Sequence, residues 1–283
     1  MRSRVAIALV VALLLVVAYV RAQQFGNQPA KLNIVKVKDD LFVIHNDFVP
    51  GNTTVLVTTE GVVLVDDKFE IDHESIMAQL KKITNQPVKY VINTHYHGDH
   101  SGGNPKLQAL GAQVITSQQA REKMAEIKQP GMANVTLDNS LRLFIGGKRI
   151  EMYRFGRAHT DGDIVVLFPD HRVLAAGDMF TFGDATPQLI DYAGGGSARD
   201  WTGTLDGALK LEFDQVVPGH GLVTTKPEMR KFRDSTLTLR TKVHDMIAGK
   251  KTKADIEKML RTDFKFADLH IQRSLDGLML ELQ

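Results

Sequence analysis

The chain contains no cysteine in its 283 residues. This absence excludes disulfide bonds, thiolate zinc ligands and cysteine nucleophiles, so stability has to come from the core and, we expect, from bound metal. Hydrophobic residues make up 43% of the chain, which is ample for one large domain or two small ones.

Basic clusters are also missing. The sequence has no block of Lys and Arg and no basic stripe interleaved with aromatic residues, which excludes a nucleic-acid partner. The net charge of +2 comes largely from residues 1–22, which carry three of the 35 basic residues and no acids, leaving 32 basic residues against 33 acidic ones. We expect a small-molecule substrate as the partner.

The one long hydrophobic run lies at the start of the chain. Residues 5–20 are apolar and follow Arg2 and Arg4, which is the layout of a secretory signal peptide. Cleavage is expected before Gln23, which predicts a periplasmic or secreted protein. The alternative is a retained anchor, because a run of 16 residues is near the lower limit for crossing a bilayer. The protein would then contact the membrane only through this segment.

A dense group of metal-binding residue types follows a predicted strand at Val88–Ile92. In an extended segment alternate residues face the same way, so His95 and His97 can bind one ion together. Asp99 and His100 lie just beyond, where the neighbouring glycines allow the chain to turn. Imidazole and carboxylate donors together favour zinc, with iron or manganese as alternatives.

The hydrophobic periodicity predicts two β-rich halves with helices outside, an α/β (α+β) arrangement of two facing sheets. A signal peptide at 1–22 and a linker at 23–31 precede a main domain at 32–225, and a helical C-terminal extension at 226–283 is expected to pack on that domain. Strands are predicted at 32–37, 41–45, 53–59, 62–65, 88–92, 113–116, 141–145, 148–155, 164–168, 172–176 and 214–217. Helices are predicted at 71–84, 105–110, 117–128, 200–212, 226–248, 253–262 and 268–282.

Three later segments repeat the pattern of an apolar strand that ends in a metal-capable residue beside glycine. They place His159, Asp178 and His220 after predicted strands. Each is a weak signal alone, and their common position after strands is what gives them weight. Thr160, Asp161 and Asp163 are better explained as turn or supporting residues than as ligands.

Taken in order, His95-x-His97-x-Asp99-His100, His159, Asp178 and His220 resemble the ligand pattern of the metallo-β-lactamase superfamily of hydrolases, over about residues 32–225. The resemblance implies a four-layer αββα sandwich with two divalent metal ions, most often zinc, at one edge of the sheets. One ion would be held by His95, His97 and His159, and the other by Asp99, His100 and His220. Asp178 would bridge them, since two ions about 3.5–4 Å apart need a shared anionic ligand.

The resemblance further implies hydrolysis of an ester, thioester, lactone or amide by a metal-bridging hydroxide, with Asp99 as the catalytic residue that orients it. β-Lactamases of the cysteine-containing subclass place Cys where this chain has Asp178, commonly with Lys three residues later, where this chain has Thr181. Asp178 instead resembles the glyoxalase II-like and lactonase-like branches. The sequence therefore favours a non-β-lactam substrate over β-lactam hydrolysis.

Two other classes stay open at this point. A mononuclear iron enzyme similar to the persulfide dioxygenases would need fewer ligands, and a non-catalytic metal-binding module would bind metal without turnover. The loop at 180–196 is a candidate wall of the site, with a plain surface connection as the alternative. The remaining histidines lack a strand-end, glycine-flanked context and are expected to be structural: His45, His73, His171, His244 and His270.

Overall fold

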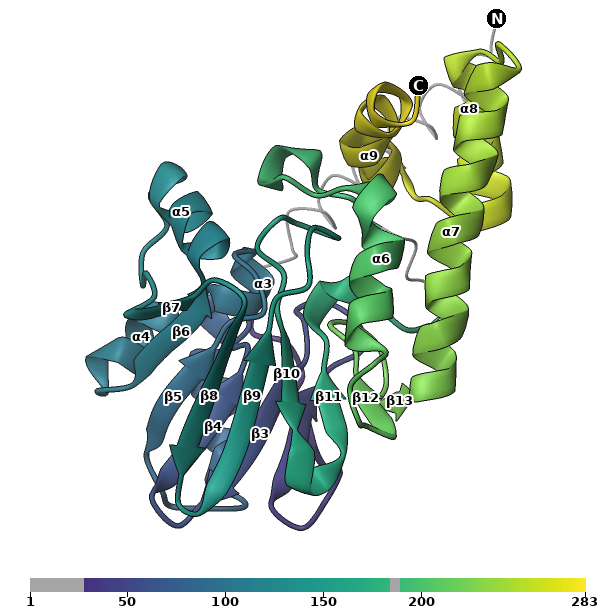
Figure 1. Ribbon diagram of the computed structural model, residues 1–283. Helices are drawn as coiled ribbons and strands as arrows, with labels where there is room; N and C mark the ends of the chain where they lie inside the picture. Colours follow the sequence, from purple (N-terminus) through teal and green to yellow (C-terminus); the bar gives the residue numbers. More distant parts are fainter. Residues whose placement is uncertain (1–27, 184–188) are drawn as a thin grey trace, which may run out of the picture.

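The computed structural model describes residues 28–183 and 189–283 as two mixed β-sheets with helices on their outer faces (Figure 1). The first sheet has the strand order β1-β2-β3-β4-β5-β6-β7 and the second has the order β13-β12-β11-β10-β9-β8. The strands of the first sheet are β1 (Asn33–Lys36), β2 (Leu41–His45), β3 (Thr53–Thr58), β4 (Gly61–Val65), β5 (Val88–Ile92), β6 (Gln113–Ser117) and β7 (Val135–Leu137). Those of the second are β8 (Ser140–Ile145), β9 (Lys148–Tyr153), β10 (Val165–Phe168), β11 (Val173–Ala175), β12 (Gln215–Val217) and β13 (Thr224–Thr225).

The alternation of side chains along each strand separates two cores. Val63 and Val65 of β4 join the cluster between the sheets, where they meet Val166 and Phe168 of β10. Val62 and Leu64 face the other way, into the cluster under the helices of the first sheet. Because both faces of this strand are covered, all five of its residues are buried.

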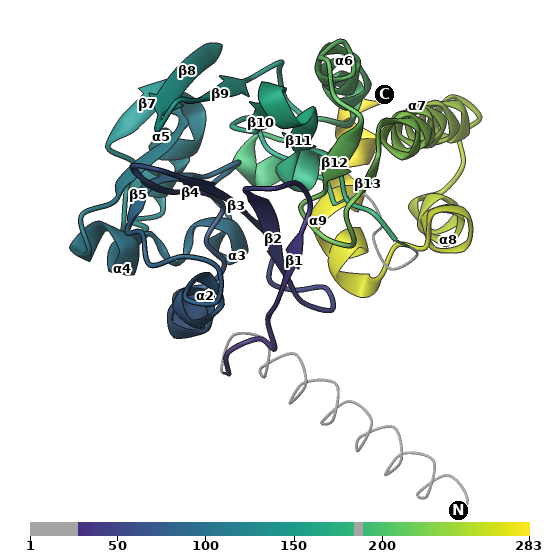
Figure 2. The same ribbon diagram turned by 90° about the horizontal axis from the view of Figure 1, so that it is seen from below.

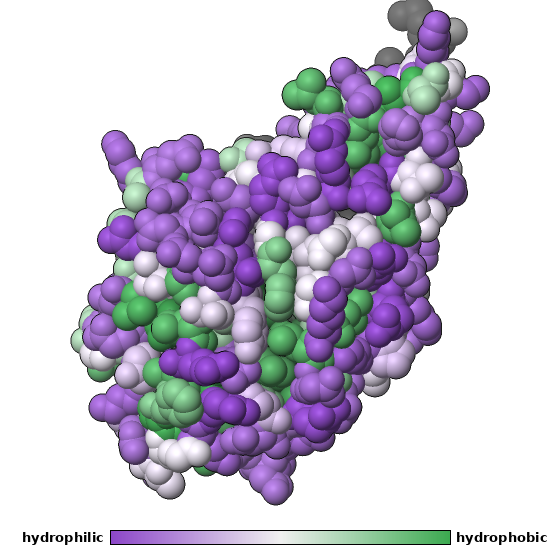
Figure 3. Space-filling model, in the orientation of Figure 1, coloured by the Kyte–Doolittle hydropathy of each residue, from purple (hydrophilic) through white to green (hydrophobic). Residues whose placement is uncertain are grey.

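Helices form the outer layers (Figure 2). Leu80 and Leu107 pack from α2 and α4 onto the first sheet, and Trp201 and Leu205 pack from α6 onto the second. On the face of the molecule that Figure 3 shows, most of the surface is hydrophilic, and hydrophobic side chains show over the second sheet. The helices are α2 (His73–Leu80), α3 (Gly98–Ser101), α4 (Asn104–Ala109), α5 (Gln118–Glu126), α6 (Ala198–Ala208), α7 (Lys226–Ala248), α8 (Lys253–Phe264) and α9 (Asp268–Glu281), with short 3₁₀ turns η1 (Glu70–Asp72), η2 (Pro169–His171), η3 (Gly177–Met179) and η4 (Tyr192–Gly194).

The last three helices share one core with the second sheet. Leu239 of α7, Leu260 of α8 and Leu275 of α9 lie in the same buried cluster as Leu174 and Val216 of the sheet. Helix α8 begins with a capping box, in which Thr252 and Asp255 bond each other's backbone N–H groups. Apolar contacts thus pack the C-terminal helices into the fold, and the capping box stabilises the start of α8.

The predicted αββα architecture is confirmed, and most predicted elements differ from the structure only at their ends. The helix predicted at 200–212 begins two residues earlier and stops at Ala208. The short strands β7 and β13 and the one-turn helix α3 were not predicted. The proposed signal peptide lies outside the described residues. Within the described part of the chain, no helix is long and apolar enough to cross a membrane.

The strand directions bring four segments to one edge. β4 and β5 are parallel, β11 and β12 are parallel, and β9 runs in the same direction as β11 because β10 is antiparallel to both. Chain segments that leave the carboxyl ends of such strands emerge together. The segments after β5, β9, β11 and β12 carry the predicted metal-binding residues.

Candidate metal centre

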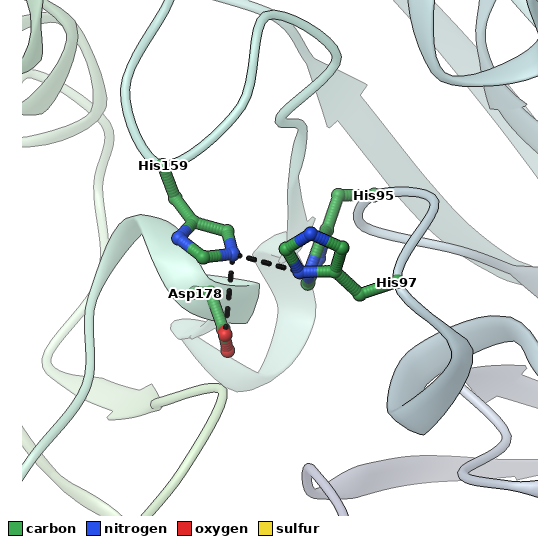
Figure 4. Close-up of side chains that lie close together, drawn as sticks. All are labelled: His95, His97, His159 and Asp178. Carbon is green, nitrogen blue, oxygen red and sulfur yellow. Dashed lines mark hydrogen bonds and ion pairs between the residues drawn. The ribbon is translucent and has the colours of Figure 1, made fainter. Parts of the chain in front are cut away.

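The first group of candidate ligands contains three histidines and one aspartate (Figure 4). His97 Nδ1 lies 3.1 Å from His95 Nε2 and 3.0 Å from His159 Nε2. Asp178 Oδ2 lies 3.6 Å from His159 Nε2. Ligand atoms bound tetrahedrally at about 2.0–2.1 Å would be roughly 3.3 Å apart, so this spacing fits donors that share one ion.

The second group contains Asp99, His100 and His220. The two Nε2 atoms of the histidines are 3.3 Å apart, and Asp99 Oδ2 lies 3.4 Å from His220 Nε2. Asp178 joins the two groups, because its other oxygen, Oδ1, lies 3.2 Å from His100 Nε2 and 3.3 Å from His220 Nε2. This buried oxygen makes no hydrogen bond of regular geometry. It is therefore available to a cation, and the residues fit a pair of metal ions.

Each of the five histidines points one ring nitrogen into its group and has the other nitrogen occupied by the protein. A partner on the outer nitrogen fixes both the ring orientation and the tautomer, as in established metal sites. The outer contacts are His95 Nδ1 to Thr94 Oγ1 at 3.1 Å, His97 Nε2 to Asp191 Oδ2 at 2.8 Å, His100 Nδ1 to Asp66 Oδ2 at 2.8 Å, His159 Nδ1 to the Leu189 carbonyl at 2.6 Å and His220 Nδ1 to the Phe48 carbonyl at 2.8 Å.

Burial and charge shift the pKa values of His159 and His220 in opposite directions. Burial lowers the pKa of His159 to about 4, so its ring is neutral near pH 7. Burial also opposes protonation of His220, but the carboxylates of Asp178 and Asp99 overcome it and raise the pKa of His220 to about 10. His159 can thus bind a metal ion without losing a proton, whereas His220 holds a proton that a metal would replace.

Two aspartates support candidate ligands, and neither was predicted to do so. Asp66 directly follows β4, and Asp191 lies in the loop before η4; each accepts a hydrogen bond from a candidate ligand. Asp191 also accepts the hydroxyl hydrogen of Tyr96. Despite the opposing effect of burial, these donors hold the pKa of Asp191 well below its usual range. Asp163, by contrast, accepts from the Thr160 backbone at 3.0 Å, as expected of a turn residue.

A cleft of about 440 Å³ opens over both groups. The residues that line it include Asp99, Asp178, Phe48 and Phe69. Thr181 and Leu189, from the described parts of the loop at 180–196, also line it. His270 of α9, which the sequence suggested to be structural, also lines this cleft, although it lies far along the chain from every predicted ligand.

The protein-family model described as "Metallo-beta-lactamase superfamily" matches residues 46–220. This chain belongs to the metallo-β-lactamase superfamily. Among curated relatives, the metallo-beta-lactamase type 2 of Elizabethkingia meningoseptica is 29% identical over 218 residues, which cover 74% of this chain and 86% of the relative. The corresponding protein of Bacillus cereus is 28% identical over 196 residues, covering 67% and 74%.

Solved structures of the superfamily share the fold. The metallo-beta-lactamase from Pontibacter korlensis superposes with a TM-score of 0.66 at 23% identity, covering 73% of this chain and 99% of that one. DIM-1 metallo-beta-lactamase superposes with a TM-score of 0.65 at 24% identity, covering 74% and 98%. The chain is accordingly a metal-dependent hydrolase of this superfamily.

The structure brings all seven predicted ligands together: His95, His97, Asp99, His100, His159, Asp178 and His220. Their two groups are consistent with a binuclear zinc centre. The individual ligand roles, and the catalytic role of Asp99, stay predictions.

Proposed function

We propose that this metallo-β-lactamase superfamily member hydrolyses the amide bond of β-lactams at a binuclear zinc centre. The substrate class is supported by curated relatives that are metallo-beta-lactamases and that align over 86% and 74% of their own length. This proposal departs from the expectation drawn from the sequence alone, which favoured an ester, thioester, lactone or amide other than a β-lactam. The observation that carries the reaction type is the convergence of two ligand groups on Asp178 at the base of a cleft.

The proposed ligand set gives each residue a task. His95, His97 and His159 would hold one ion, Asp99, His100 and His220 the other, and Asp178 would contribute one oxygen to each. When bound, two zinc ions supply an activated water and polarise the carbonyl under attack.

Asp99 is the proposed catalytic residue. Although burial acts against ionisation, His100 and His220 hold the pKa of Asp99 well below its usual range, so its carboxylate stays ionised at neutral pH. It lines the cleft, where it can accept a hydrogen bond from the attacking water and so orient it. The same carboxylate can take the proton that this water loses and pass it to the departing amine nitrogen.

The cleft walls suit a partly apolar substrate. The Phe48 ring lies 5.0 Å from the His220 ring, and Phe69 and Leu269 also line the cleft. These side chains exclude water from the reacting bond and contact the apolar parts of a bicyclic ring system.

An ester, thioester or lactone is the second candidate. The observation in its favour is Asp178, which stands where the cysteine-containing β-lactamases place Cys, together with Thr181 in place of their Lys. A carboxylate that bridges two metal ions can support hydrolysis of an amide bond or of an ester-type bond.

The proposed activity is tested with protein stripped by chelator and reloaded with two equivalents of zinc. Loss of β-lactam absorbance should be catalysed by the loaded protein and abolished in the Asp178→Ala variant, whereas Gly203→Ala, a change on the outer surface of α6, should retain it. Turnover of lactones or thioesters with none of β-lactams would shift the function to the second candidate. One equivalent of iron with oxygen consumption would overturn both.

We further propose export of the protein to the periplasm or to the medium. The basis is the apolar run at residues 5–20 behind Arg2 and Arg4. Sequencing the amino terminus of the protein recovered from the periplasm tests cleavage before Gln23.

A further inference from the structure

The two ligand groups differ in what holds the loop beside each of them. Helix α9, which brings Arg273 to the wall of the cleft, fixes the loop beside the first group. The Ser274 hydroxyl lies 3.1 Å from the Ile190 backbone nitrogen, and the Tyr192 hydroxyl donates to the carboxylate at the end of the same helix over 2.8 Å. The second group has a different neighbour, which is the β2–β3 loop, residues 46–52.

The β2–β3 loop contacts every member of the second group. The Phe48 carbonyl accepts a hydrogen bond from His220 Nδ1 over 2.8 Å. Gly51 lies against the His100 ring, where an added methyl carbon would be 2.2 Å from the ring. The Gly51 backbone N–H also donates to the Asp99 carbonyl over 3.2 Å. The position of this loop therefore sets the orientation of His220 and the room for His100.

A single buried amine bonds the β2–β3 loop at two places. Lys68 is the only buried lysine in the described parts of the chain. Its Nζ donates to the Gly51 carbonyl over 2.5 Å and to Asn46 Oδ1 over 3.0 Å. Asn46 Nδ2 in turn donates to the Pro50 carbonyl over 2.9 Å, which closes the loop on itself. The amine therefore holds both the start of the loop and the residue that lies against His100.

The backbone of Lys68 is fixed as well. Lys68 lies shortly after β4, and its carbonyl accepts hydrogen bonds from the backbone N–H groups of Gly102, over 2.8 Å, and Gly103, over 3.2 Å. These glycines belong to the turn that follows His100. Lys68 thus connects this turn with the β2–β3 loop and holds the two segments in register with each other.

The contact between Lys68 and the loop does not depend on the charge of the amine. Taking an amine out of water costs free energy unless its hydrogens find acceptors. Burial lowers the pKa of Lys68 to about 7, although the carboxylates of Asp72, Asp66 and Asp99 act in the opposite direction. Both partners of Nζ are acceptors, and an amine donates two hydrogen bonds in either protonation state. The loop is therefore held across the neutral pH range.

We propose that Lys68 is a positioning residue for the second metal ion and that it acts through the β2–β3 loop. By holding Gly51 and the start of the loop, it keeps the Phe48 carbonyl where it orients the His220 ring. A partner on the outer nitrogen of a ligating histidine sets the geometry of metal binding. The inference rests on the proposed binuclear centre and is independent of the substrate that is cleaved.

Lys68→Met is the test variant, because methionine keeps an unbranched side chain in the buried space but removes both hydrogen bonds. Competition of the full chain against a chromophoric chelator should show the affinity for the second zinc ion falling about tenfold, with the first ion within about twofold. Leu80→Ala is the control for lost stability alone, because Leu80 packs in the core between α2 and the first sheet. Neither zinc affinity should change in this control.

A second variant, Asn46→Ala, tests whether Lys68 acts through the loop. It removes one of the two acceptors of Nζ at a half-buried position, so it should weaken the second zinc ion in the same way but less. Because both changes break one chain of contacts, adding Asn46→Ala to Lys68→Met should cost less affinity than Asn46→Ala costs alone. Additive losses would mean that the two residues act independently, which would overturn the proposed route.

Hydrogen exchange of the metal-free protein separates this inference from the proposed binuclear centre. The Gly51 and Asn52 amides are both hydrogen-bonded, and Lys68→Met should speed their exchange at least about tenfold relative to Leu80→Ala. Unchanged exchange, or an equal loss of affinity for both zinc ions, would refute the positioning role. Binding of a single zinc ion by the wild type would refute the binuclear centre instead, and faster exchange in Lys68→Met must then still be seen for the fixing of the loop to stand.

Discussion

Replacing Asp191 with alanine should selectively weaken the binding of one of the two metal ions. Asp191 is buried and receives hydrogen bonds from His97 Nε2, at 2.8 Å, and from the Tyr96 hydroxyl. The change removes the acceptor that orients the His97 ring, and no other candidate ligand in the described residues bonds this side chain. The ion assigned to His95, His97 and His159 should therefore bind less tightly, while the second ion keeps all of its ligands.

The magnitude follows from what the change leaves behind. Two buried donors lose their acceptor, at a cost of about 1–3 kcal/mol each in the free energy of unfolding. Loss of a carboxylate that supports a ligating histidine typically weakens metal binding by about 10- to 100-fold, or about 1.4–2.8 kcal/mol. Because the His97 and Asp191 side chains are only 15% and 7% exposed, screening by water should reduce this effect little.

Competition against a chromophoric chelator measures the two zinc affinities separately. Tyr96→Phe is the matched control, because it removes the other donor to Asp191 but leaves the contact with His97 intact. It should lower stability without a comparable loss of metal affinity. Equal zinc affinities in wild type and Asp191→Ala would refute the reasoning, as would an equal weakening in Tyr96→Phe.

Three further outcomes are expected. Zinc binding near pH 7 should release a proton from His220, because Asp178 and Asp99 overcome the effect of burial and raise the pKa of His220 to about 10. It should release none from His159, because burial lowers the pKa of His159 to about 4. Affinity should accordingly rise with pH up to about 10, and titration calorimetry in buffers of different ionisation enthalpy checks both statements. Gly51→Ala should reduce activity at least about tenfold, because the new methyl carbon would lie 2.2 Å from the His100 ring and displace it. A zinc titration should show the loss of affinity at the site of Asp99, His100 and His220. Gly203→Ala, exposed on α6 with no atom within 4 Å of the new carbon, should instead raise stability by about 0.5–1 kcal/mol in urea denaturation at unchanged activity.

The candidate ligands were predictable because each follows an apolar strand and has a glycine within three residues. His95 and His97 share one side of an extended segment, which is a local property that the sequence states directly. The supporting residues carry no such signal. Asp191 is 94 residues from His97, and Asp66 is 34 residues from His100, so only the folded chain brings them together.

The same limit explains the missed elements. β7 is three residues long and only Leu137 of it is buried, so its sequence lacks the alternation that identifies a strand. Arg273 and His270 belong to a helix whose periodicity predicts one buried face, but nothing in that pattern says what the other face meets.

The contacts of α9 have a consequence for the order of assembly. The segment that steadies the loop beside His97 follows that loop by 84 and 89 residues, the distances along the chain from Ile190 to Ser274 and from Tyr192 to Glu281. A nascent chain that has not yet reached α9 can present His95 and His97 but lacks these contacts. Tight metal binding should therefore wait until α9 has been synthesised and has packed against the loop.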